Sequence, residues 1–80
     1  MNAKPQLRLV RVDTAGEPAA MVATWMMGEL LNVPGVSVRF QHPDLVTLET
    51  GTAEELDIVQ TRINTLLAEP RFARWAVRGG

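Results

Sequence analysis

The stretch 19–31 constrains the fold most, because its apolar residues have helical spacing and cover nearly every side. It holds three of the chain's four methionines, and its single charged residue is Glu29. The start at Glu17-Pro18 and the stop at 32–35 suit a helix. A helix that is apolar all round needs cover on more than one side. We therefore predict that one stripe of this helix packs on a sheet. The flanking residues Met21, Met27 and Leu31 are predicted to be exposed and to bind a partner.

The length of 80 residues allows one domain, residues 1–80, with flexible ends expected at 1–5 and 79–80. Domains of this size bury only about 60% of their unfolded surface, and many gain stability by oligomerising. The chain has no cysteine and one histidine, so we expect no disulfide, metal or cofactor. It has no apolar run of about 18 residues and no signal-peptide pattern, so we expect no membrane span and a cytoplasmic location.

Four segments have the composition of strands, with turn residues between them: 6–13, 36–41, 45–50 and 71–78. A capping box at Thr52–Glu55 opens a second, amphipathic helix, with Leu56, Val59, Ile63 and Leu66 on one face. The order β-α-β-β-α-β predicts an α+β ferredoxin-like fold, a four-stranded antiparallel sheet with two helices packed on one face. We expect 6–13 and 71–78 to be the central strands. Inward residues are expected at Val36, Val38, Phe40, Val46 and Leu48.

The layout, with Val33-Pro34-Gly35-Val36 leading from helix to strand, resembles several groups of small ferredoxin-like modules. These are heavy-metal carriers, amino-acid-sensing regulatory domains, small assembly chaperones and RNA-recognition domains. Metal carriers place two cysteines before the first helix, where this chain has Thr14-Ala15-Gly16. RNA-recognition domains carry aromatic residues on the central strands, and the segment 6–13 has none. The resemblance thus implies a ferredoxin-like fold. The missing cysteines argue against metal carriage, and the missing aromatic residues make RNA binding the third choice of function.

The charges are unevenly distributed, although the net charge is only −1. Most acidic residues fall in or beside the predicted helices, whereas five arginines fall in the predicted strands: Arg8, Arg11, Arg39, Arg74 and Arg78. The sheet face opposite the helices could then carry Arg39, Arg74 and Arg78 together with Arg8 or Arg11. Guanidinium groups suit bidentate contacts with carboxylate or phosphate. The alternative is a solvated face in which Glu49 and Thr47 are the local partners.

Catalytic groups are sparse in this sequence. His42 lies in a turn before Pro43-Asp44, and Ser37, the single serine, lacks a nucleophile-elbow context. The terminal Gly79-Gly80 resembles the tails of ubiquitin-like and sulfur-carrier proteins, which enter an adenylating enzyme. Those proteins begin with a β-hairpin, whereas here only 14–16 separate the first strand from the first helix.

We therefore predict a non-enzymatic protein-binding or regulatory module that binds a protein partner or forms a homodimer. Its expected partner-binding residues are Arg8, Arg39, Arg74 and Arg78 on the sheet, and Met21, Met27 and Leu31 on the helix. A carrier using Gly79-Gly80 is the alternative, and a weak RNA-binding module is the third choice. A small-molecule ligand is left open, because no residue pattern identifies one.

Overall fold

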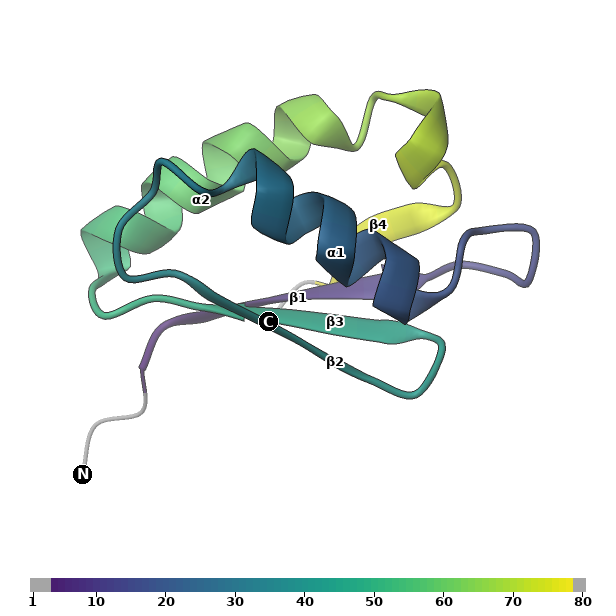
Figure 1. Cartoon of the computed structure of the whole chain (residues 1–80), viewed down its shortest axis with the longest axis horizontal. Helices are drawn as coiled ribbons and strands as arrows, with labels where there is room; N and C mark the ends of the chain where they lie inside the picture. Colours follow the sequence, from purple (N-terminus) through teal and green to yellow (C-terminus); the bar gives the residue numbers. More distant parts are fainter. Residues whose placement is uncertain (1–3, 79–80) are drawn as a thin grey trace.

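The computed structural model describes residues 4–78. In chain order its elements are β1 (Gln6–Arg11), α1 (Ala19–Glu29), β2 (Ser37–Gln41), β3 (Leu45–Glu49), α2 (Ala53–Leu66), the 3-10 helix η1 (Pro70–Phe72) and β4 (Trp75–Arg78). The four strands form an antiparallel sheet, and both helices lie on the same side of it (Figure 1). This confirms the predicted ferredoxin-like arrangement. The ends expected to be flexible fall largely outside the described residues, although the carbonyl of Pro5 accepts a hydrogen bond from Thr50 N at 3.1 Å.

The strand order is β2-β3-β1-β4. The prediction that the last strand is central was therefore wrong. β1 and β3 are central, and β4 is an edge. The reason is topological, because each βαβ unit skips one strand. The β1–α1–β2 unit spans β3, and the β3–α2–β4 unit spans β1, so the two units interleave. Each central strand therefore belongs to a different unit.

The side chains of β1 alternate between the two faces of the sheet. Leu7 and Leu9 are buried toward the helices, while Gln6 and Arg8 are exposed on the opposite side. The strand ends at Arg11, two residues short of the predicted segment 6–13, so Val12 lies beyond it and is 63% exposed. Leu9 faces Val46 on β3 and Val77 on β4, which fixes the register of the sheet centre.

The core lies between the sheet and the two helices. Its members are mainly the inward residues of β1 and β3 and one face of each helix: Leu7, Leu9, Ala19, Val22, Ala23, Met26, Leu30, Val46, Leu48, Val59, Ile63, Leu66, Phe72 and Trp75. α2 is capped by Thr52, whose side chain accepts from the amide of Glu55 at 3.2 Å, as predicted. Within residues 4–78, neither helix is long and apolar enough to cross a membrane.

Residues 70–74 depart from the predicted strand 71–78. Pro70 starts η1, whose Phe72 is fully buried and meets Trp25 edge to face with 5.7 Å between ring centroids. Arg74 then adopts a left-handed φ of 71°, which turns the chain into β4. The strand is therefore confined to Trp75–Arg78.

Phe40 was predicted to point inward, but 53% of it is exposed. It pairs with Val46 and so lies on the helix side of the sheet. β2 is an edge strand, however, and α1 leaves this position uncovered. Val38 and Val36, by contrast, are half-buried against the core.

Candidate functional site

The sheet face opposite the helices carries a row of arginines that crosses all four strands. Arg39 on β2 is paired with Thr47 on β3, Thr47 with Arg8 on β1, and Arg8 with Arg78 on β4. Neighbouring strands lie about 4.8 Å apart, so this row is about 14 Å wide. We call Arg39, Arg8 and Arg78 the arginine row. The structure therefore brings together three of the four arginines that were predicted to bind a partner.

Arg8 and Arg78 are direct cross-strand neighbours, and both are exposed. Among residues 4–78, neither forms an ion pair with an acidic side chain. Like charges directly opposite each other destabilise an antiparallel pair of strands. These two strands thus hold two arginines at directly paired positions, and the pairing of like charges does not stabilise the sheet.

Arg39 is better compensated than its two companions. Its Nη2 lies 3.4 Å from Oε2 of Glu49, and the same oxygen accepts a hydrogen bond from Gln6 Nε2 at 2.9 Å. The Arg39 side chain is still 60% exposed, whereas that of Glu49 is 21% exposed. Among the strand positions that the structure describes on this face, the single acidic residue is Glu49, and it contacts Arg39. The Arg8–Arg78 end of the row therefore stays uncompensated.

An apolar row lies beside the arginines. Leu45, Val10 and Ala76 are half-buried and occupy adjacent strands two residues along from Thr47, Arg8 and Arg78. A shallow hollow of about 200 Å³ spans the two rows on β1, β2 and β3, lined by Gln6, Arg8, Arg39, Gln41, Leu45 and Thr47. The strand positions on this face include no aromatic residue. The face therefore offers cations beside aliphatic groups, and no surface for base stacking.

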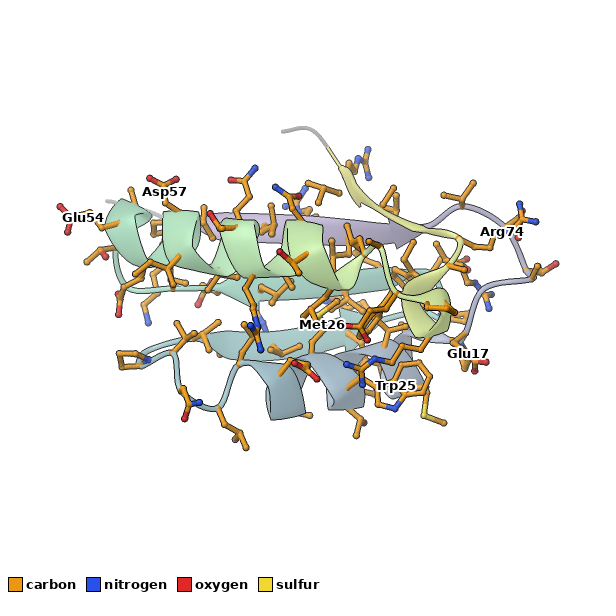
Figure 2. The ribbon with its side chains drawn as sticks, turned by 90° about the horizontal axis from the view of Figure 1, so that it is seen from above. Glu17, Trp25, Met26, Glu54, Asp57 and Arg74 are labelled. Atoms are coloured by element: carbon orange, nitrogen blue, oxygen red, sulfur yellow. The ribbon has the colours of Figure 1, made fainter. Side chains whose placement is uncertain are left out.

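Arg74 and Arg11 do not join the arginine row. Arg74 precedes β4 and pairs with Asp13 at 3.2 Å; Figure 2 shows it at one end of the molecule, opposite Glu54. Arg11 points to the helix side, where its Nε lies 2.8 Å from Oδ1 of Asp44. The expectation that Arg74 shares the open face is therefore not met, because the turn at Arg74 breaks the strand alternation.

The predicted helix flank is exposed: Met21 is 43%, Met27 47% and Leu31 82% accessible. α1 ends at Glu29, so Leu31 lies in the turn beyond the helix, but it lines the same groove beside β2 as Met27. Met21 lies about 120° round the helix from Met27, because six residues turn an α-helix by about 600°. The predicted flank is therefore divided into two surfaces. Met27 and Leu31 form the one that borders β2, and Met21 lies on the other.

One ion-pair network was missed by the sequence analysis, which described Glu29 only as the single charged residue of 19–31. Glu29 binds Arg71 at 2.6 Å and Arg62 at 3.3 Å, and the Arg71 guanidinium lies 4.7 Å from the centre of the Phe72 ring. The hydrogen bond from Arg71 lowers the pKa of Glu29 and outweighs its partial desolvation. The same bond raises the pKa of Arg71. Arg62 and Arg71 lie 33 and 42 residues from Glu29 along the chain. A local sequence pattern therefore could not predict these ion pairs.

No constellation of three His, Cys, Asp or Glu side chains suited to a metal occurs within residues 4–78. His42 occupies the β2–β3 turn with a left-handed φ of 58°, in keeping with its predicted turn role. One strand, β1, precedes α1, without the hairpin of ubiquitin-like proteins, and Gly79-Gly80 lies outside the described residues. Comparison with protein-family models, curated proteins and solved structures gives no match.

Proposed function

We propose that this protein is a binding module, not an enzyme, whose open sheet face captures an acidic segment of a partner protein. The observation that carries the proposal is the Arg8–Arg78 pair, two exposed arginines at directly paired strand positions, neither with an acidic partner among the described residues. A carboxylate placed between them would relieve their repulsion and accept charge-assisted hydrogen bonds, each about twice as strong as a neutral one.

The apolar row next to the arginines supports a protein segment over a nucleic acid. Leu45, Val10 and Ala76 suit aliphatic side chains that alternate with carboxylates along an amphipathic segment. Nucleic-acid readers of this fold stack bases on aromatic residues, and proteins that bind phosphate backbones are commonly basic overall. This face lacks aromatic strand residues, and the chain has a net charge of −1.

The test is fluorescence anisotropy with a labelled synthetic peptide that presents Glu and Leu on one face. The native protein should bind it, and higher salt should weaken binding because exposed charges are screened. Changing both Arg8→Gln and Arg78→Gln should lower affinity by about tenfold or more, since two charge-assisted contacts are lost.

Arg74→Gln is the matched control, because Arg74 is equally a surface arginine, with a side chain 57% exposed, but lies off the row. Its affinity should match that of the native protein. Tighter binding of single-stranded RNA than of the acidic peptide would overturn the proposal in favour of nucleic acid. Equal losses in the control and the double variant would also overturn it. The expected cytoplasmic location stays a prediction, which fractionation of producing cells would test.

A further inference from the structure

A second apolar surface lies at the other edge of the sheet, where α1 meets β2. Leu31, Phe40 and Met27 are 82%, 53% and 47% exposed. A groove of about 410 Å³ runs between the end of α1 and β2, with Met27, Leu31, Val36 and Val38 in its lining. Phe40 continues this surface along the helix side of β2, because it pairs with Val46. We call Met27, Leu31, Val36, Val38 and Phe40 the apolar edge.

The backbone edge of β2 is equally unprotected. β2 ends the sheet, so one side of it has no neighbouring strand within residues 4–78. Natural edge strands usually block further pairing with proline, lysine, inward charges or a bulge. Ser37–Gln41 contains neither proline nor lysine, and its one charged residue, Arg39, lies on the open face. A free strand edge and an apolar surface therefore coincide.

We propose that the occupant of this edge is a second copy of the chain, paired antiparallel through β2 about a two-fold axis at Val38. Identical edges pair antiparallel by two-fold symmetry, so one surface serves both copies. The axis must pass through a residue if both copies keep their helices on the same side of the joined sheet. An axis at Val38 places Val38 against the partner's Val38, and Val36 against the partner's Phe40. All of these side chains lie on the helix side.

The charges disfavour the neighbouring register that has its axis at Arg39. An axis at Arg39 would set two arginines directly opposite each other, which destabilises antiparallel strands. With the axis at Val38, Arg39 faces the partner's Ser37, which is itself paired with Glu49 of the same copy. Arg39 of one copy then lies two strands away from Glu49 of the other copy, in the same row across the joined sheet. The interface is thus complementary in charge as well as in apolar contacts.

The available area suits a dimer that dissociates on dilution. At about 200 Å² for a fully exposed large side chain, the exposed fractions of Leu31, Phe40 and Met27 amount to roughly 360 Å² per copy. A standard stable interface buries about 800 Å² per partner. These three side chains supply nearly half of that area, and the strand backbone, Val36, Val38 and Arg39 add to it.

Cysteine cross-linking tests the register, because the chain has no cysteine of its own. Val38→Cys should form a disulfide-linked dimer under mild oxidation, since directly opposed residues lie within bonding range. Arg39→Cys should not, because diagonal neighbours lie about 7–8 Å apart, beyond the limit of about 7 Å. Ile58→Cys is the matched control on the outer face of α2, at a site 60% exposed. Linkage through Arg39→Cys, or equal linkage at all three sites, would overturn the register and with it the proposal.

Light scattering of the native protein across a dilution series provides a test that needs no variant. The mass should fall from dimer to monomer on dilution, and Phe40→Glu should remain monomeric at concentrations where Ile58→Glu is dimeric. A native protein that is monomeric throughout would overturn the proposal. Arg8→Gln with Arg78→Gln lies off this edge and should leave the dimer intact, so failure here is distinct from failure of acidic-peptide binding.

Discussion

Arg8 and Arg78 lie directly opposite each other on β1 and β4, with no acidic side chain of the described residues paired to either. An oppositely charged pair or a neutral pair at these two positions would stabilise the sheet more. The pair therefore weakens the fold locally while it concentrates positive charge on the open face. Such a local conflict between residue choice and stability is typical of a functional surface.

Arg39→Glu should weaken acidic-peptide binding and barely change stability. Arg39 is 60% exposed and its contact with Glu49 is long, so the lost ion pair is worth less than about 1 kcal/mol. The new carboxylate would also repel an acidic peptide. Anisotropy and thermal melting of the same sample measure both effects. A large loss of stability with unchanged affinity would show that Arg39 acts structurally.

Met27→Glu should abolish the dimer while the monomer stays folded. Met27 is half-exposed, so the monomer should lose no more than about 0.5 kcal/mol, whereas the dimer would bury an unpaired carboxylate. Light scattering reports the mass, and denaturant unfolding reports the stability of the monomer. Unfolding of the variant together with a native protein that is monomeric would instead place Met27 in the core.

Acid should reduce stability partly through Glu29. Its pKa is lowered in the folded protein, so its ion pairs stabilise the fold above the usual value of 4.5 and lose this effect as the pH falls below it. Glu29→Gln should melt lower than the native protein near neutral pH, and the difference should shrink on acidification. Paired thermal melts across this range measure it, because every other carboxylate is common to both proteins. A difference that is constant with pH would exclude the ion pairs as its cause.

Two glycines should respond in opposite directions to alanine. Gly28 is exposed on α1 with no atom within 4 Å of an added Cβ, so Gly28→Ala should stabilise by roughly 0.5–1 kcal/mol. Gly35 has a φ of +76°, and a Cβ there would lie 2.9 Å from Glu55 Oε2. Gly35→Ala should therefore destabilise by about 1 kcal/mol or more. Denaturant midpoints compare the two; a stabilising Gly35→Ala would contradict the turn geometry.

Local patterns were sufficient to predict both helices, the order of the four strands along the chain and most of the core. The Thr52 cap, the alternation around Val46 and Leu48, and the apolar stripe of α2 each reflect contacts between residues close in the chain or a simple periodicity. The fold class followed from the order of these elements.

Features that depend on distant contacts could not be predicted in this way. The interleaving of β1 and β3 depends on how whole βαβ units pack, and the exposure of Phe40 depends on β2 being an edge. The alignment of Arg8 with Arg78 is a matter of register between strands at opposite ends of the chain. Glu69-Pro70 did carry a signal for η1, because proline favours the first position of a helix.

Thermal melting and peptide binding of Arg78→Glu together test the central claim most directly. The substitution turns a like-charge pair into an opposite-charge pair, so the sheet should gain roughly 0.2–1 kcal/mol and melt a few degrees higher. The same change should weaken binding of the acidic peptide about tenfold, because Arg8 is then neutralised internally. A lower melting temperature, or an affinity equal to that of the native protein, would contradict the claim that this pair is kept for an acidic partner.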